Sequence, residues 1–471
     1  MKSPKLSLRA LTALLLLCSA WVAAPAQSAP EPRREQLLNG LRILMWSRPA
    51  DQNVLIRLRV HSGAAFDLAG KEGLMATLVD AMFDQQTRDY VTEELGGRIE
   101  VVLGYDAIDI TLAGRSTDFD RLLELARNAV TNPQLTPENF ERVRAARVKA
   151  LREKTQTAAA AADLAAAARL FGAYPYGRGT AGTPESLAAA QRGDILLLRE
   201  RFLNPDNTTL VIVGGFEPKR VMRSMRESFG GWRKSDRAVP ATFKLPEPPD
   251  ERTLVVNRAD AAGVELRLAL RGFARTDIDS PAAQVIAQVV RARWLAAMPE
   301  LRERSAYAGH DAYRENGIFR MGATLQSPAE AAKALEAARK ILNDLSTNAP
   351  TAAELDAAKQ AAASALGANV SGDEAAASAW LDEHTYKNKA ATADALARAA
   401  QALPPGDAQR VAARLFLHAP VATVALGDAA QLRTELARVG TVEVFGEAAA
   451  KPPQPQPTPK PQQPTLQLKR P

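Results

Sequence analysis

The sequence predicts an α+β protein made of two similar domains, each a mainly antiparallel sheet packed with helices. Two internal matches carry this prediction. Residues 54–67, VLIRLRVHSGAAFD, resemble residues 264–277, VELRLALRGFARTD, and both alternate apolar and polar residues as half-buried strands do. Residues 201–216 resemble the segment from Arg414 onward. The offsets, 210 residues for the first match and 213 for the second, are nearly equal, as expected when one unit occurs twice.

The elements of the first half follow from periodicity and from cap residues. One predicted helix starts near Thr136, because Thr can cap a helix, Pro137 suits a first turn and Glu138 favours the positive helix end. Strands are predicted at residues 40–45, from residue 54, at 97–102, 107–113 and 209–213, and helices at 71–85, 117–130, 139–154, 158–171 and 218–229.

Composition divides the chain into five parts. Residues 246–250 read PEPPD, which cannot continue a helix or a central strand, so we place a linker there. We expect the first domain at residues 30–245 and the second at residues 251–448. Residues 1–29 and residues 449–471 flank these domains.

The two ends differ from the body. Residues 1–29 combine a basic start, an apolar run at Leu11–Val22 and small residues that suit cleavage, as a secretory signal peptide does; an uncleaved anchor is the alternative. The single cysteine, Cys18, lies in this segment, so the mature chain has no thiolate for a metal. Residues 449–471 are rich in Pro and Gln, and we expect a disordered tail that acts as a spacer or, alternatively, as a docking segment. These features predict a periplasmic protein that has no membrane contact after signal cleavage.

The net charge of +7 does not indicate a nucleic-acid-binding protein. Lys2, Lys5 and Arg9 supply three of the positive charges, and the segment from Lys451 onward supplies four, with no acidic residue in either end. The body is therefore balanced. It offers no basic face for phosphates, so we expect no nucleic-acid partner.

Several spaced motifs resemble one peptidase family. They are YPYG at residues 174–177, GTPESL at 182–187, FLNPDN at 202–207 and FGGW at 229–232. In this order they resemble the pitrilysin/insulinase family of zinc peptidases, and in particular its mitochondrial-processing-peptidase-like bacterial branch, over about residues 37–445. The resemblance implies two bowl-shaped halves that close as a clam-shell.

The resemblance also implies a degenerate zinc site. Active members bind zinc through His-x-x-Glu-His on one helix and a Glu on a later helix. The two His positions fall on Ala76 and Asp80, the water-activating Glu falls on Val79, and the third ligand falls on Val143. We therefore expect this chain to bind no cofactor, with zinc held by a partner subunit.

Other side chains of the sequence are candidate ligands. Asp80 and Asp84 are four residues apart, so on one helix they would share a face and could hold a hard cation; the other interpretation is that both are solvated polar residues. His61 follows a strand and is interpreted as a turn residue. The remaining histidines have no metal-ligand spacing: His310, His384 and His418.

The second half contains a candidate pair for catalysis. Active members use an Arg and a Tyr in a stretch similar to LREKRGLAYSV, where the Tyr hydroxyl donates to the oxyanion. Residues 301–307 read LRERSAY, so Arg302 and Tyr307 are the candidates. The stretch is two residues shorter than the family pattern. The other interpretation is a surface arginine and a tyrosine packed on the sheet.

The resemblance implies a non-catalytic subunit of a periplasmic zinc metalloendopeptidase. Its partner would be a homologous chain with His-x-x-Glu-His, and the two would enclose an unfolded or extended peptide, with Arg302 and Tyr307 lent to the partner's site. A peptide-binding or assembly protein with no proteolytic role is the first alternative. An active metallopeptidase with atypical ligands is the second.

Overall fold

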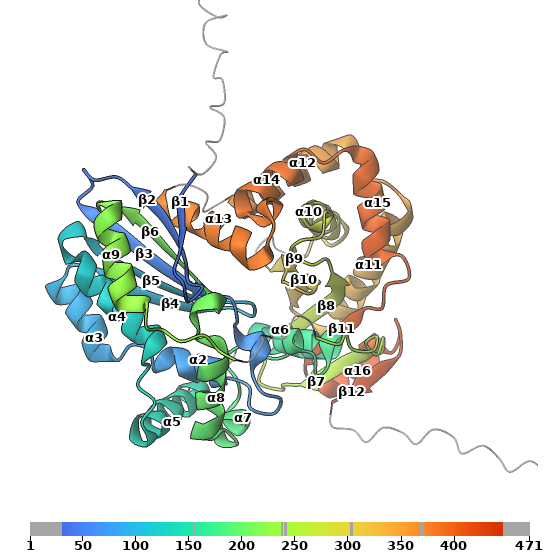
Figure 1. Cartoon of the computed structure of the whole chain (residues 1–471). Helices are drawn as coiled ribbons and strands as arrows, with labels where there is room; N and C mark the ends of the chain where they lie inside the picture. Colours follow the sequence, from blue (N-terminus) through green and yellow to red (C-terminus); the bar gives the residue numbers. More distant parts are fainter. Residues whose placement is uncertain are drawn as a thin grey trace, which may run out of the picture.

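The computed structural model describes residues 31–153, 157–236, 239, 243–301, 305–367 and 372–445. The predicted signal peptide, the whole of the predicted tail and Arg302 lie outside these residues. Two halves lie side by side, and each contains a six-stranded sheet with helices on both faces (Figure 1). The predicted α+β fold with two similar domains is confirmed. Among the described residues, no helix is long and apolar enough to cross a membrane.

The first sheet has the strand order β1-β2-β6-β3-β5-β4. All neighbours are antiparallel except β2 and β6, which are parallel. The strands are β1 (Arg33–Gln36), β2 (Arg42–Ser47), β3 (Asn53–Val60), β4 (Arg98–Leu103), β5 (Ile108–Arg115) and β6 (Thr208–Gly214).

The second sheet has the order β12-β7-β11-β8-β10-β9. Its last five positions repeat the pattern of the first sheet, including the parallel pair, here β7 and β11. Arg57 pairs with Val211 in the first sheet, and Arg267 pairs with Val424 in the second. Arg267 lies 210 residues after Arg57, and Val424 lies 213 residues after Val211. The two strand pairs are therefore equivalent, and they show both predicted offsets. The strands are β7 (Thr253–Asn257), β8 (Val264–Gly272), β9 (Ala306–Ala312), β10 (Gly317–Leu325), β11 (Ala422–Gly427) and β12 (Val442–Val444).

One predicted helix of the first half is wrong. The helix expected at residues 71–85 is α2 (Leu74–Asp80), and a second helix, α3 (Gln85–Asp89), begins after a break. Asp84 causes the new start, because its side chain accepts a hydrogen bond from the Thr87 amide at 2.8 Å and caps α3. The other helices are α4 (Phe119–Thr131), α5 (Pro137–Glu153), α6 (Ala158–Phe171), α7 (Pro184–Ala188), α8 (Arg192–Phe202) and α9 (Pro218–Phe229), with a π-helical turn at Tyr90–Glu94.

In the second half, α10 lies between the sheet and an arc of four helices, α11, α12, α14 and α15 (Figure 1). The helices of the second half are α10 (Ser280–Ala297), α11 (Pro328–Thr347), α12 (Ala352–Gly367), α13 (Asp373–Tyr386), α14 (Ala393–Gln401), α15 (Pro405–Phe416) and α16 (Ala429–Leu436). Short 3₁₀ turns occupy Ala64–Phe66, Ser116–Asp118, Pro175–Gly177, Pro205–Asn207 and Lys389–Ala391.

One helix of each half packs on the sheet of the other half. Helix α6 packs on β8 and β11 of the second sheet, and α13 packs on β3 and β6 of the first. Trp380 and Leu381 of α13 form a buried cluster with Leu55 and Val213 of the first sheet. Because burial of a large apolar side chain stabilises by about 1.5–3 kcal/mol, this exchange joins the halves through their cores.

Equivalent arginines hold the exchanged helices. Arg57 of β3 donates to the Ser378 hydroxyl of α13 at 2.5 Å, and Arg267 of β8 donates to the Asp163 carboxylate of α6 at 2.6 Å. Each arginine also donates a hydrogen bond to a backbone carbonyl of the same exchanged helix, one turn before Ser378 or Asp163. Ser378 lies 215 residues after Asp163, close to the offset of the strands. The duplication therefore extends to the contacts between the halves.

Candidate functional site

Helix α2, which carries three of the four predicted zinc positions, lies beneath the first sheet beside α5 and β4. The Asp67 carboxylate fixes its start by accepting hydrogen bonds from the Gly73 amide at 2.8 Å and the Met75 amide at 2.7 Å. Gly73 has φ of 93°, which favours glycine. Burial raises the pKa of Asp67 to about 6, although the two amides oppose this effect.

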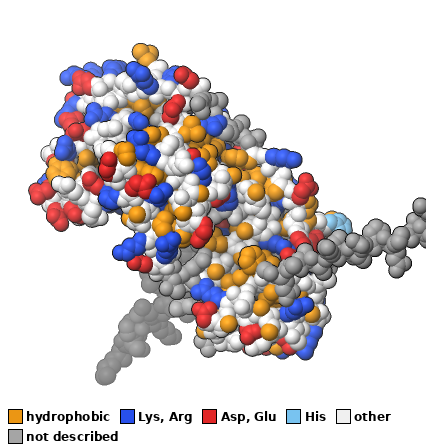
Figure 2. Space-filling model, turned by 90° about the horizontal axis from the view of Figure 1, so that it is seen from below, with side chains coloured by type: hydrophobic (Ala, Val, Ile, Leu, Met, Phe, Trp, Pro, Cys, Tyr) orange, Lys and Arg blue, Asp and Glu red, His pale blue; other side chains and the backbone are white. Residues whose placement is uncertain are grey.

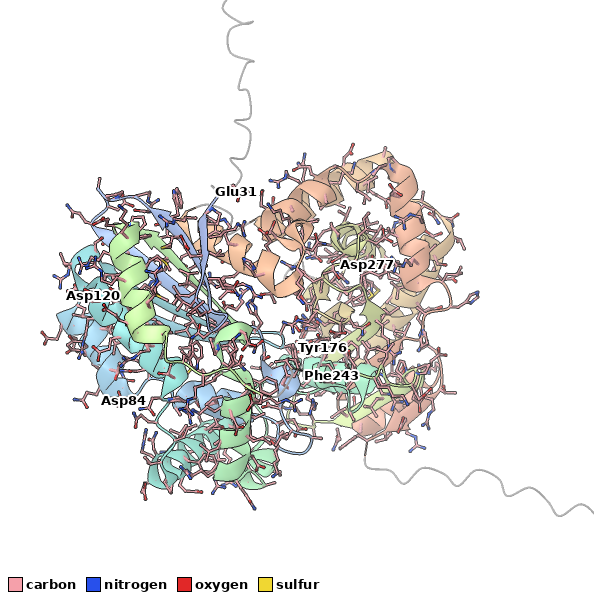
Figure 3. The ribbon with its side chains drawn as sticks, viewed as in Figure 1. Glu31, Asp84, Asp120, Tyr176, Phe243 and Asp277 are labelled. Carbon is pink, nitrogen blue, oxygen red and sulfur yellow. The ribbon has the colours of Figure 1, made fainter. Side chains whose placement is uncertain are left out.

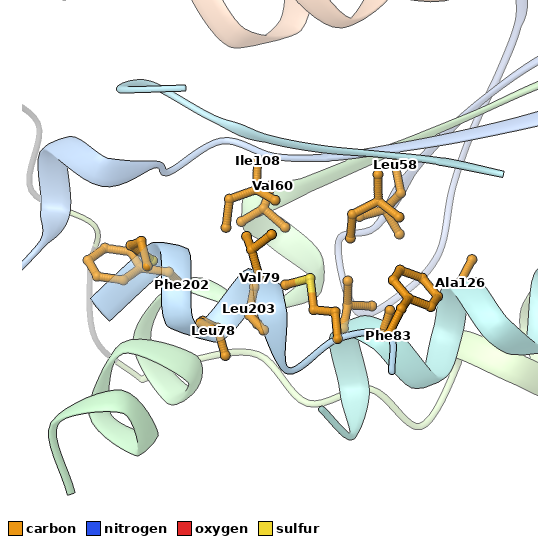
Figure 4. Close-up of a cluster of buried hydrophobic side chains, with 14 of the residues drawn as sticks. Leu58, Val60, Leu78, Val79, Phe83, Ile108, Ala126, Phe202 and Leu203 are labelled. Carbon is orange, nitrogen blue, oxygen red and sulfur yellow. The ribbon is translucent and has the colours of Figure 1, made fainter. Parts of the chain in front are cut away.

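Two predicted positions on α2 belong to the hydrophobic core. Ala76 is 2% exposed and Val79 is 9% exposed. Figure 4 shows Val79 pointing toward the sheet, where Val60 and Ile108 lie, and all three belong to one buried cluster. A methyl and an isopropyl group donate no electron pair, so neither position binds a metal or activates water.

The third predicted position on α2 is Asp80, which forms an ion pair with Arg147. The Asp80 carboxylate accepts a hydrogen bond from Arg147 of α5, and Arg147 also donates to the Ala181 carbonyl at 3.3 Å. Val143, the fourth predicted position, is 5% exposed and lies one helical turn before Arg147. The gap between α2 and α5 is therefore bridged by a guanidinium group.

The suggested Asp80 and Asp84 pair is wrong as a cation site. The two residues do not share a helix face, because α2 ends at Asp80 and Asp84 caps α3. The hydrogen bonds from Thr87 keep the pKa of Asp84 below its usual value. Each carboxylate thus has its own protein partner.

The histidines do not provide an alternative site. His61, at a bend after β3 as predicted, is buried, and its ring nitrogens lie 3.0 Å from the Thr385 hydroxyl and 2.9 Å from the Thr209 hydroxyl. His310 accepts a hydrogen bond from the Phe273 amide at 2.9 Å. Burial lowers the pKa of both imidazoles, that of His310 to about 4. Within the described residues, no three His, Cys, Asp or Glu side chains are placed to hold a metal, so the residues present do not fit zinc.

The hydroxyl of Tyr307 forms a hydrogen bond within this chain. Its hydroxyl donates to the Asp163 carboxylate at 2.7 Å, and the Arg267 guanidinium lies 5.4 Å from its ring centroid. Gly322 separates Tyr307 from Arg267 across three strands, and a Cβ there would come within 2.7 Å of the Tyr307 ring. Burial is the main cause of the raised pKa of Tyr307. The other predicted member, Arg302, lies outside the described residues.

The YPYG motif joins the halves. The Tyr176 hydroxyl donates to the Asp106 carboxylate at 2.9 Å and accepts a hydrogen bond from the Glu315 amide, in the turn between β9 and β10, at 3.2 Å. The Tyr176 ring lies 4.7 Å from the ring of Tyr313. Figure 3 shows Tyr176 and Phe243 near this junction. The motif thus holds the two halves in register.

Sequence reasoning missed Arg147, Asp163 and Arg267 as members of these clusters. The available signal for Arg147 was its spacing, because a residue four positions after Val143 shares the same helix face. No local pattern indicated Asp163, since its partner Tyr307 is 144 residues away.

Two models of one family match the chain. A model described as Insulinase (Peptidase family M16) matches residues 42–183, and one described as Peptidase M16 inactive domain matches residues 189–362. The chain belongs to the M16, or insulinase, family. No curated protein matches the chain in sequence. The M16 assignment confirms the predicted family, and the match to an inactive domain supports a non-catalytic M16-like chain.

Solved structures share the fold. A protease from Helicobacter pylori has a TM-score of 0.74 at 17% identity, over 85% of this chain and 100% of that one. An M16 inactive domain from Pseudomonas fluorescens has a TM-score of 0.71 at 17% identity, over 85% and 98%. A chain of complex III2 from Candida albicans has a TM-score of 0.71 at 14% identity, over 86% and 99%. At these identities the likeness shows the M16 clam-shell fold.

Proposed function

We propose that this chain is the non-catalytic subunit of a periplasmic zinc endopeptidase and pairs with an M16 chain that carries His-x-x-Glu-His. The state of the zinc positions carries the proposal. Ala76, Val79 and Val143 are buried and apolar, and Asp80 is bound to Arg147. In this proposal the zinc belongs to the partner, and secretion follows from the signal sequence of residues 1–29.

The sheet edges supply a means of holding peptide. In the described part of the chain, β4 pairs only with β5 and β9 pairs only with β10, so each is the last strand of its sheet. The outer backbone groups of an edge strand can pair with an extended peptide. Such pairing reads the backbone of an unfolded substrate and depends little on its side chains.

The finer part of the proposal concerns Arg302 and Tyr307, which the subunit would lend to the partner's site. In the chain alone, the Tyr307 hydroxyl donates to Asp163. Lending therefore requires Tyr307 to exchange this carboxylate for the oxyanion of the substrate when the subunits close.

The experiment compares cleavage of an unfolded peptide by this chain, by the partner and by both together. We expect no cleavage by this chain alone and cleavage by the pair. Tyr307→Phe in the pair should lower kcat about tenfold or more, because an oxyanion donor is lost. Tyr90→Phe, in the π-helical turn of the first half, is the matched control and should leave kcat unchanged. Chelator-sensitive cleavage by this chain alone would overturn the proposal.

The likeness to a chain of complex III2 favours a second candidate, an assembly protein with no proteolytic role. Purification of the native complex separates the two candidates. A companion chain with His-x-x-Glu-His supports the peptidase subunit, whereas a stable complex that lacks such a chain supports the assembly role.

A further inference from the structure

The gap between α2 and α5 contains a cation that belongs to the protein. By the family resemblance, a metal there would be bound by the side chains at positions 80 and 143. In this structure the side chain at position 80 already binds the guanidinium of Arg147. Arg147 follows Val143 by one turn on the same face of α5, so its positive charge lies between two of the predicted ligand positions, 143 and 80.

The backbone near α2 holds Arg147 in this place. Gly73 and Gly182 both have positive φ, and their backbones touch so closely that a Cβ on Gly182 would lie 2.2 Å from the Glu72 carbonyl. This contact fixes the neighbouring Ala181 carbonyl, which accepts a hydrogen bond from Arg147 at 3.3 Å. The guanidinium thus has one partner on a helix and one on a rigid loop.

The ion pair does not act mainly as a stability clamp. The side chain of Asp80 is 40% exposed and that of Arg147 is 19% exposed, so water screens their attraction. The consequence of the pair is the position of its charge. A guanidinium held in this place repels a divalent cation at short range, and it is also hydrogen-bonded to one carboxylate oxygen of Asp80.

We propose that Arg147 is the resident cation between α2 and α5 and opposes the binding of a divalent metal there even when the ligand residues are restored. The proposal rests on the non-catalytic role proposed above. It adds that a positive charge within the protein, as well as the absence of ligands, opposes a metal at this place. Back-substitution of the ligands alone will therefore give a site that binds zinc more weakly than a site from which Arg147 is also removed.

The test uses two variants of the full chain. The first carries Ala76→His, Asp80→His and Val143→Glu, and the second adds Arg147→Ala. Zinc affinity is measured for both by competition with a chromophoric chelator at pH 7.5. We expect zinc to bind at least about tenfold more tightly when Arg147 is removed, a difference of about 1.4 kcal/mol. Arg152→Ala, in place of Arg147→Ala, is the matched control on the same helix and should give no gain. Equal affinities, or an equal gain from Arg152→Ala, would overturn the proposal.

A single substitution at a partly exposed position tests the proposal if the buried substitutions prevent folding. Asp80→His places one imidazole at the partly exposed position, and NMR titration gives its pKa with and without Arg147→Ala. A neighbouring cation lowers an imidazole pKa, so removal of Arg147 should raise it by about 0.5 or more. An unchanged pKa contradicts the proposal. Stoichiometric zinc in the unmodified chain would instead contradict the proposed non-catalytic function, so the two failures are distinct.

Discussion

At the residue scale, the cluster of Asp163, Arg267 and Tyr307 ties the first half to the second. We expect Asp163→Ala to lower the free energy of unfolding by about 2–3 kcal/mol, because it removes a partner from a buried arginine and from a tyrosine hydroxyl. Tyr307→Phe should cost about 1 kcal/mol. Urea denaturation measures both. Asp356→Ala, at an exposed position, is the control, and a loss for Asp163→Ala no larger than the control's would contradict the account.

A second prediction at this scale concerns acid stability. His310 has a folded pKa of about 4, lowered by burial, and an unfolded pKa of about 6.5. Between these values the unfolded chain binds a proton that the folded chain does not, so stability present above pH 6.5 falls as the pH falls. Between pH 7.5 and pH 5 we expect this residue to contribute a loss of about 1–2 kcal/mol. Denaturation at both pH values should show a smaller difference for His310→Asn than for the wild type or the exposed control His418→Asn.

Among the site residues, the sequence could show what was missing but not what had been added. Comparing the two ligand-bearing stretches of the family with this chain placed apolar residues at Ala76, Val79 and Val143, and the structure shows all three buried. The added group, Arg147, contacts a residue 67 positions earlier, and contacts at such separations leave no periodic signal.

At the element scale, the exchanged helices α6 and α13 determine how the halves hold together. A protease site inserted between Glu247 and Pro248 of the full chain, which are both exposed, would allow the connection to be cut after folding. We expect the cut halves to co-elute on gel filtration at micromolar concentration, because each helix is buried on the sheet of the other half. Halves that separate on dilution without denaturant would contradict this expectation.

Local patterns predicted most elements but not the exchange. Helix α6 agrees with the predicted range, yet its sequence, AAAAADLAAAARLF, gives no indication of which sheet it covers. The predicted helix at residues 71–85 failed because a capping aspartate, Asp84, starts a new helix inside an otherwise continuous pattern. Periodicity identifies the buried face of a helix, whereas its partner is decided by the whole chain.

At the scale of the whole molecule, the duplication was predictable and the strand pairing was not. Two offsets indicated a repeated unit, and the equivalent strand orders confirm it. The parallel pairs inside each sheet join strands far apart in the chain, so no local turn reveals them.

Charges of both signs are interspersed over the face shown in Figure 2.

We expect this chain to supply no metal chemistry of its own. The most direct test is the zinc content of the purified full chain after equilibration with excess zinc and removal of unbound metal, measured by mass spectrometry of the element. The account predicts no more than about 0.1 zinc per chain, because no site of suitable donors exists among the described residues. About one zinc per chain, released by a chelator together with peptide-cleaving activity, would contradict it.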